Sequence, residues 1–179
     1  MLSEMRRIGI LSDTHGYLHP RLFDFFKDCD EIWHAGDIGS EEVLDKLESF
    51  KPTRAVWGNI DHHRLRLRLP EKQLFEMEGH TIAILHIAGR PGKYTHDART
   101  IISEFQPSVL VGGHSHILQV KYDSSGHLLF INPGAAGING FHQKLTMLRL
   151  SFNNKEISNL EVFEINRDKA FTEYGQPSE

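Results

Sequence analysis

Short apolar runs in the first half of the chain predict strands that alternate with helices. The runs at residues 7–11, 32–35 and 53–57 have the length of buried strands and end in polar turns. Between the first two runs, residues 20–28 carry apolar side chains at helical spacing. Ser40, followed by two glutamates, is typical of a helix N-cap and first turn. This order predicts an α/β core sheet.

Hairpin patterns dominate the second half of the chain. Pairs of apolar runs flank short polar turns within residues 74–85, 117–131 and 143–165. Thr95 is placed to cap a further helix, and residues 109–111 form one more short apolar run. We therefore expect the core sheet to pack against a second, more antiparallel sheet.

Two segments lack a clear pattern. Residues 60–73 contain an alternation of arginine and leucine that leads to Pro70, and they are expected to form an irregular exposed segment. Residues 167–179 are polar and are expected to form a flexible C-terminal tail. The rest of the chain, residues 1–166, is expected to form a single domain, because a chain of 179 residues suits one compact unit.

Composition narrows the classes of function. The formal net charge of −4 gives no reason to propose a nucleic-acid-binding surface, although bound cations would still allow a small phosphorylated substrate. The single cysteine, Cys29, excludes an internal disulfide. We expect no signal peptide at the N-terminus, and no apolar run reaches the roughly 20 residues that span a bilayer. These features predict a cytoplasmic protein without membrane contact.

Residue types that bind metals follow five of the predicted strands within a few positions. They are Asp13 and His15, then Asp37, then Asn59, then His86, and finally His114 with His116. Each short motif is common in ordinary turns when it stands alone. In open α/β sheets, however, ligands gather at the carboxyl ends of strands, so a shared edge would bring these side chains together. Asp13 and His15, two positions apart on an extended segment, would point to the same side.

The ordered series D-x-H, G-D, G-N-x-D, H and G-H-x-H resembles the calcineurin-like metallophosphoesterase superfamily. It is most similar to the small YfcE-type phosphodiesterases, over roughly residues 6–165. The resemblance implies a four-layer α/β/β/α sandwich of two mixed sheets. It also implies hydrolysis of a small phosphate ester, most of all a phosphodiester, by a hydroxide that bridges two divalent metal ions and attacks phosphorus in line.

The resemblance also implies a ligand set. Asp13, His15 and His116 would bind the first metal, and Asp37 would bridge the two metals. Asn59, His86 and His114 would bind the second metal, with Asp37, Asn59 and His114 also assigned to catalysis. Nitrogen and oxygen ligands of this kind suit Mn first, and also Fe, Zn, Ni or Co, better than Ca or Mg.

The sequence departs from the family pattern at two positions. Many members have a histidine where this chain has Ile60, and that histidine is thought to protonate the leaving group. Asp61, which would orient it, is therefore expected to lose its partner, unless His62 or His63 takes the role. Ile87 follows His86 where glycine is more common.

Alternatives remain beside the enzyme. The superfamily includes the scaffold subunit of retromer, so a protein-binding scaffold is one alternative, and a nuclease bordered by Arg64, Arg66 and Arg68 is another. Arg90 is either an ordinary solvated side chain or a contact for a substrate phosphate. His34 is expected in the core or behind the metal ligands, and His142 is expected to be an ordinary histidine. The family also leaves a homodimer open.

Overall fold

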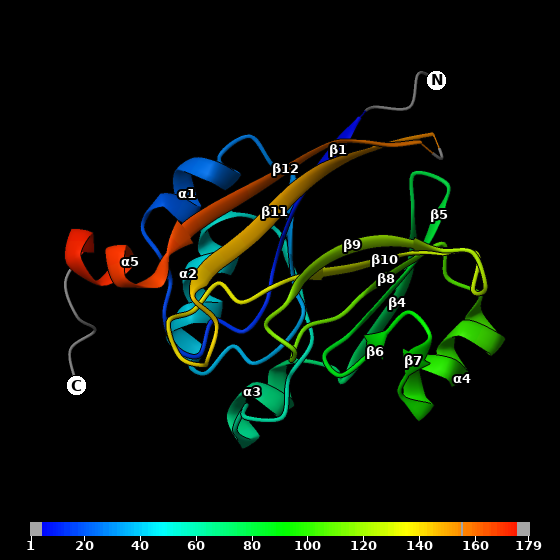
Figure 1. Ribbon diagram of the computed structural model, residues 1–179, viewed down its shortest axis with the longest axis horizontal. Helices are drawn as coiled ribbons and strands as arrows, with labels where there is room; N and C mark the ends of the chain where they lie inside the picture. Colours follow the sequence, from blue (N-terminus) through cyan, green and yellow to red (C-terminus); the bar gives the residue numbers. More distant parts are fainter. Residues whose placement is uncertain (1–4, 155, 175–179) are drawn as a thin grey trace.

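Two five-stranded sheets form the centre of the molecule (Figure 1). The computed structural model describes residues 5–154 and 156–174. The first sheet has the order β12 (Glu156–Asn166), β11 (Lys144–Asn153), β1 (Arg6–Leu11), β2 (Glu31–His34) and β3 (Thr53–Ala55). The second has the order β4 (Lys72–Met77), β5 (His80–Leu85), β8 (Val109–Val111), β10 (Leu128–Pro133) and β9 (Leu118–Asp123). A small hairpin joins β6 (Gly89–Arg90) to β7 (Lys93–Tyr94).

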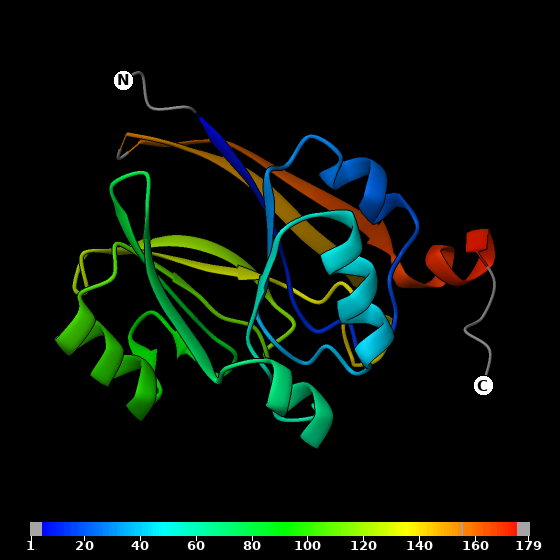
Figure 2. The same ribbon diagram turned by 180° about the vertical axis from the view of Figure 1, so that it is seen from behind.

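Helices cover the outer faces of both sheets and complete four layers (Figures 1 and 2). Helices α1 (Arg21–Phe26) and α2 (Glu41–Phe50) cover the first sheet, and α4 (His96–Phe105) covers the second. Helix α3 (His63–Arg68) lies at the edge of the sheets, and α5 (Arg167–Tyr174) follows the end of β12. Buried side chains of α1 and α2, such as Phe26 and Leu44, pack on one sheet, and Ile101 of α4 packs on the other. Ile10 and Ile84 belong to the apolar layer between the sheets. The predicted α/β/β/α sandwich is confirmed.

Both sheets are mixed to the same degree, so the expectation of a more antiparallel second sheet is wrong. In the first sheet β1, β2 and β3 run parallel, while β11 and β12 add antiparallel pairs. In the second sheet β8 lies between β5 and β10 and is parallel to both. The crossover through α4 gives β8 the direction of β5, which a hairpin could not do.

Residues 60–73 are more regular than the sequence predicts, since they contain α3 and the start of β4. Tertiary contacts explain why the short helix α3 forms. Leu65 is buried against the first sheet, whereas Leu67 stays 73% exposed. Arg68 pairs with Asp45 and Glu48 of α2, at 2.8 Å in each case. The period-two alternation of arginine and leucine therefore did not indicate the local structure.

Part of the expected C-terminal tail is also helical. Helix α5 follows β12 directly, and its Ala170 is fully buried beside Leu145 and Ile165. The Arg167 backbone N–H donates to the Gln143 carbonyl at 2.8 Å, which anchors the start of the helix. Residues 167–174 are thus helical, which the sequence did not predict, and residues 175–179 lie outside the described residues.

The helix caps agree with the sequence. Ser40 Oγ accepts from the Val43 N–H at 3.4 Å, and Thr95 Oγ1 accepts from the Ala98 N–H at 3.3 Å. None of the helices in the described ranges is both long and apolar enough to cross a membrane. The carboxyl ends of β1, β2 and β3 share one edge of the first sheet, where the predicted ligands follow.

Candidate metal centre

The loops that follow the parallel strands bring the predicted ligands together in two groups. The first group is Asp13, His15 and His116, and the second is Asp37, His86 and His114. Within each group one ligand atom per residue lies within 4.8 Å of the others. The two groups coincide with the two ligand sets that the family resemblance implies, apart from Asn59, which joins the second through its amide oxygen.

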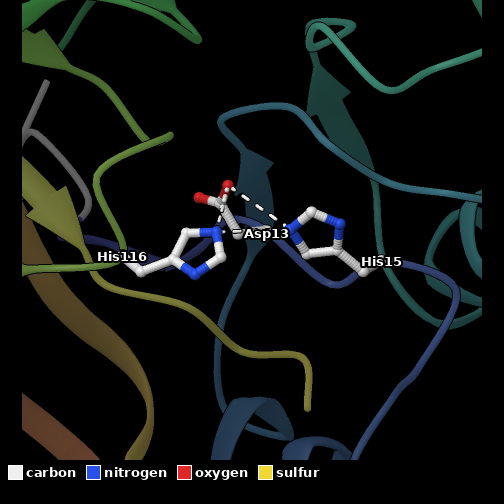
Figure 3. Close-up of side chains that lie close together, drawn as sticks. All are labelled: Asp13, His15 and His116. Carbon is white, nitrogen blue, oxygen red and sulfur yellow. Dashed lines mark hydrogen bonds and ion pairs between the residues drawn. The ribbon is translucent and has the colours of Figure 1, made fainter. Parts of the chain in front are cut away.

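In the first group, two imidazoles face one buried carboxylate (Figure 3). His116 Nε2 lies 3.2 Å and His15 Nε2 lies 3.8 Å from Asp13 Oδ1, and the two nitrogens are 3.3 Å apart. Asp13 Oδ2 accepts from the His114 backbone N–H at 3.0 Å. Asp13 Oδ1, although buried, accepts no hydrogen bond within the described ranges. A buried carboxylate oxygen that accepts no hydrogen bond is suited to bind a cation.

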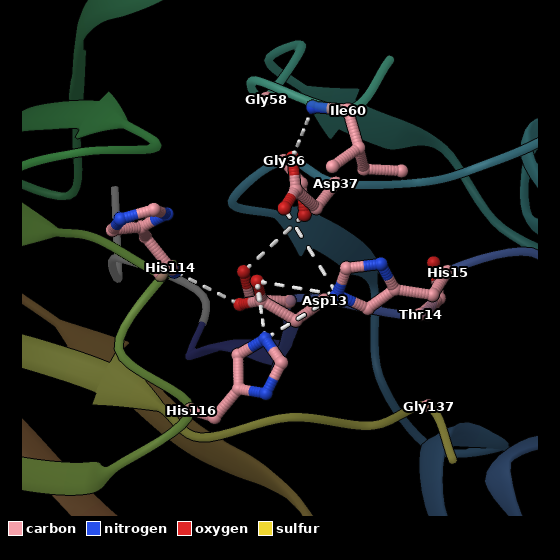
Figure 4. Close-up of polar contacts among 12 residues, drawn as sticks. Asp13, Thr14, His15, Gly36, Asp37, Gly58, Ile60, His114, His116 and Gly137 are labelled. Atoms are coloured by element: carbon pink, nitrogen blue, oxygen red, sulfur yellow. Dashed lines mark hydrogen bonds and ion pairs between the residues drawn. The ribbon is translucent and has the colours of Figure 1, made fainter. Parts of the chain in front are cut away.

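The second group repeats the pattern around Asp37. His86 Nε2 lies 3.2 Å from Asp37 Oδ1 and 3.1 Å from Asn59 Oδ1. The other oxygen, Asp37 Oδ2, lies 3.9 Å from His15 Nε2 of the first group. Figure 4 shows this carboxylate above Asp13, with the His15 ring beside both. One carboxylate therefore faces both groups, as a bridging ligand would.

Hydrogen bonds behind the histidines fix which ring nitrogen faces the centre. His86 Nδ1 donates to the Ala35 carbonyl at 2.7 Å, which leaves Nε2 as the nitrogen directed at Asp37. His142 Nε2 donates to the Gly137 carbonyl at 2.8 Å, so its Nδ1 is an acceptor. His116 Nδ1 donates to this acceptor at 3.1 Å. The lone pair of His116 Nε2 is thereby turned toward Asp13.

The backbone is strained at most of the ligands. Asp13, His15, Asp37, His114 and His116 all have positive φ, between 47° and 67°. Each such residue costs about 1–2 kcal/mol relative to ordinary backbone, and strain of this kind gathers at functional sites. The prediction that Asp13 and His15 lie on one extended segment is therefore wrong, because β1 already ends at Leu11. They converge through tight turns instead.

The charges of the centre favour cations. Burial alone would raise the pKa of Asp13, but the contact with His116 and the charge of His86 hold it below its usual value. Burial would raise the pKa of Asp37 too, but its contact with His86, the Ile60 N–H and the charge of His15 together hold it below its usual value. Burial lowers the pKa of His15 despite the neighbouring carboxylates. At neutral pH the centre thus presents two carboxylates and a neutral His15.

Comparison with known proteins agrees with this geometry. Residues 5–155 match the family described as the calcineurin-like phosphoesterase superfamily domain. The chain belongs to this superfamily.

Three known proteins are similar to this chain. A probable metallophosphoesterase of Methanothermobacter thermautotrophicus is 33% identical, over 72% of this chain and 76% of its own length. A phosphodiesterase of Methanocaldococcus jannaschii is 25% identical, over 72% of this chain and 82% of its own. The structure of vacuolar protein sorting 29 from Cryptosporidium parvum superimposes with a TM-score of 0.70 at 16% identity, covering 90% of this chain and 98% of that one. At that identity the last similarity concerns the fold alone.

Asp61 lacks the histidine that it would orient, since residue 60 is isoleucine, but it has other partners in this chain. Its buried carboxylate accepts from the backbone N–H groups of Ile38 at 3.1 Å, Gly39 at 2.8 Å and Gly58 at 2.8 Å. It thereby joins the loop that carries Asp37 to the loop that carries Asn59. A carboxylate can accept several hydrogen bonds, so this role of Asp61 does not depend on a histidine at residue 60.

Buried polar residues support the other loops. His34 Nδ1 accepts from the Gly36 N–H at 3.1 Å, and its Nε2 donates to Thr14 Oγ1 at 2.9 Å. Burial lowers the pKa of His34 to about 4, so it stays neutral in this supporting position, as expected. Asn132 donates to the Gly113 carbonyl at 2.8 Å and so supports the loop of His114.

Two glycines of the motifs are required by close approach. A Cβ at Gly113 would meet Asp13 Oδ2 at 2.8 Å, and one at Gly58 would collide with Asp37 Oδ1. Any larger residue would therefore displace a carboxylate of the centre.

The arginines on α3 do not form a free basic patch. Arg68 is paired with acids of α2, and Arg64 lies 3.6 Å from Glu41 of the same helix although it is exposed. The Arg66 guanidinium lies 4.3 Å above the Trp57 ring. Arg90 lines a cavity of about 340 Å³ together with Lys93 and Ser115, apart from the carboxylates of the centre. The nuclease alternative therefore gains no support from these residues.

His142 is the functional candidate that the sequence did not indicate. It lies 26 positions after His116 in a polar loop, where no motif marks it. Only the folded chain shows the hydrogen bond between the two rings.

Proposed function

We propose that this chain is a phosphodiesterase that holds two divalent cations between the two ligand groups. The observation that supports the proposal most is the Asp37 carboxylate, whose two oxygens face His86 of one group and His15 of the other. A buried carboxylate between two sets of ligand atoms suits the short spacing of a two-metal site.

The donor set defines which residues would hold each cation. Asp13, His15 and His116 would bind one cation, Asn59, His86 and His114 the other, and Asp37 both. Imidazole with carboxylate and amide oxygen suits Mn, and also Fe, Zn, Ni or Co. Bound divalent cations supply a Lewis acid for phosphate oxygens and lower the pKa of a coordinated water to about 7.

The protein groups then position the ester. Hydrogen bonds to the Ala35 carbonyl and to His142 turn Nε2 of His86 and of His116 toward the site, where a phosphate anion would meet the charge of bound cations. Arg66 donates to the Asn59 carbonyl at 3.2 Å and helps to hold that loop in place. The side chain of Ile60, 38% exposed beside Asn59, offers no proton to a leaving group.

Leaving groups of low basicity should therefore react fastest. Without an acid at residue 60, we expect the rate to rise steeply from phenyl to nitrophenyl phosphodiesters, since the better leaving group needs less protonation. The measurement is kcat over a series of substituted phenyl diesters. A flat response would show that another residue protonates the leaving group.

The preference for diesters rests on the relative from Methanocaldococcus jannaschii, which is named a phosphodiesterase. The test is hydrolysis of bis(4-nitrophenyl) phosphate and of 4-nitrophenyl phosphate by protein purified without chelator, with added Mn, Zn, Ni or Mg. We expect faster hydrolysis of the diester and about two bound metals per chain. Asp37→Asn keeps the size of the side chain and tolerates the positive φ. This variant should lose both the hydrolysis of the diester and the bound metals.

A protein-binding scaffold is the second candidate, because the fold is shared with vacuolar protein sorting 29. The same experiment separates the two candidates. Metal bound without hydrolysis of any ester would favour the scaffold, and hydrolysis that depends on Asp37 would exclude it as the sole role.

A further inference from the structure

A cavity of about 240 Å³ opens directly beside the second ligand group. Asn59 and His86 form part of its lining, so a phosphate held at the metal centre would have an ester group at the cavity entrance. Trp57, Leu85 and Ile87 also line it. The side chain of Ile87 is 41% exposed, which leaves an apolar surface open to a ligand.

The indole of Trp57 is held firmly in the wall of this cavity. The Arg66 guanidinium lies 4.3 Å from the centre of the ring and covers one of its faces. Arg66 is itself fixed by its donation to the Asp61 carbonyl at 2.7 Å. A ligand in the cavity would therefore meet the remaining face or the edge of a ring that is already immobilised, which lowers the entropy lost on binding.

The charges around the cavity disfavour a second anionic group. Two acidic residues, Glu71 and Asp97, line it together with one cationic residue, Lys72. The cavity of Arg90 and Lys93 has the opposite balance. An uncharged group suits the first cavity better, because like charges placed together in a site cost binding free energy.

We propose, resting on the phosphodiesterase function above, that the Trp57 cavity binds an uncharged aromatic ring carried by one ester group of the substrate. The volume suits one ring system, and a flat ring can stack on the indole or pack on its edge. Stacking of this kind contributes about tenfold to binding, the lower part of the range for bases on aromatic side chains. Trp57 is thus the residue that determines specificity for the ester group.

The experiment titrates zinc-loaded protein with phenylphosphonate and with methylphosphonate, which carry the same anion with and without a ring. Tryptophan emission and calorimetry are followed together. The only other tryptophan, Trp33, is fully buried between the sheets, so a change in emission reports on Trp57. We expect phenylphosphonate to bind about tenfold more tightly and to change the emission, and methylphosphonate to leave the emission unchanged.

Variants assign the effect to the ring. Trp57→Phe should keep the preference for phenylphosphonate and lose the change in emission, whereas Trp57→Leu should lose the preference. Tyr122→Leu, at an exposed aromatic of β9 outside the cavity, is the matched control and should change neither. Zinc content is measured for each variant. If Trp57→Leu loses zinc, the role of Trp57 is tested by the binding of the two phosphonates to the wild type and to Trp57→Phe.

The outcomes separate this inference from the phosphodiesterase function. Equal binding of the two phosphonates, or tighter binding of phenylphosphonate that persists in zinc-loaded Trp57→Leu, would overturn the role of Trp57 while hydrolysis remained intact. Failure of both phosphonates to bind, with no ester hydrolysed, would overturn the phosphodiesterase function itself.

Discussion

At the scale of single residues, the centre depends on hydrogen bonds that orient its ligands. The ring of His142 accepts from His116 Nδ1 and is itself tied to the Gly137 carbonyl. Such outer partners fix the tautomer of a metal-binding histidine and raise its basicity.

Removing the acceptor should weaken metal binding. We expect His142→Ala to lower the affinity of the first site for Zn about 10- to 100-fold, because His116 loses the partner of Nδ1. His142→Asn, whose Oδ1 takes the place of the ring Nδ1, should retain most of the affinity. His96→Ala, at an exposed histidine at the start of α4, serves as the control. Equal zinc affinity in all three variants would refute the orienting role.

The lone cysteine makes a separate prediction about pH. Burial raises the pKa of the Cys29 thiol from its usual 9.0 to about 11. The folded state therefore binds this proton more tightly than the unfolded state, and the stability it contributes is present below about pH 9 and lost as the pH approaches 11.

The measurement is the free energy of unfolding in urea at pH 8, 9 and 10. We expect a decline with pH that is shallower in Cys29→Ala, since other groups that titrate there are common to both proteins. Parallel curves would contradict the prediction. The native thiol should also fail to react with a disulfide reagent at pH 8 and react fully once unfolded.

At the scale of elements, the strand ends determine where the ligands lie, and the sequence predicted most of this. The apolar runs of β1, β2, β5 and β8 are visible as patterns, and so are the polar residues that follow each strand. The helix α3 was not visible, because one buried leucine and contacts with α2 stabilise it rather than any periodicity. The pairing of His142 with His116, and of Asp61 with three backbone N–H groups, depends on loops distant in sequence, which no local pattern specifies.

Asp61 should stabilise the loops that carry Asp37 and Asn59. Asp61→Ala leaves three backbone N–H groups without their acceptor, and we expect it to lower the free energy of unfolding by roughly 3 kcal/mol. Zinc affinity should fall as well, because Asp37 and Asn59 lose their relative placement. The matched control is Asp24→Ala on α1, an exposed aspartate. Unchanged stability and zinc affinity in Asp61→Ala would contradict this view.

At the scale of the whole molecule, the two sheets each supply part of the centre. The loops after β1, β2 and β3 carry Asp13, His15, Asp37 and Asn59, and the loops after β5 and β8 carry the three other histidines. Cations bound there would hold one sheet against the other.

Removal of metal should therefore lower thermal stability. At a metal concentration of 100 times Kd, binding stabilises the folded state by about 2.7 kcal/mol, which corresponds to roughly 5–11 °C in Tm for a chain of this size. The measurement is thermal unfolding with zinc and with chelator. Asp37→Asn should show no comparable shift, and a Tm of the wild type that ignores chelator would argue against a site shared by the sheets.

The apolar layer between the sheets has a consequence for substitutions that are remote from any ligand. Trp33, Ile84 and Phe152 in this layer set how far apart the sheets stand. A smaller or larger side chain there would slide one half of the ligand set relative to the other, while every ligand stayed intact. Loss of turnover without loss of folding is then the expected phenotype of some interior mutations, because the packing between the sheets determines the spacing of the ligands.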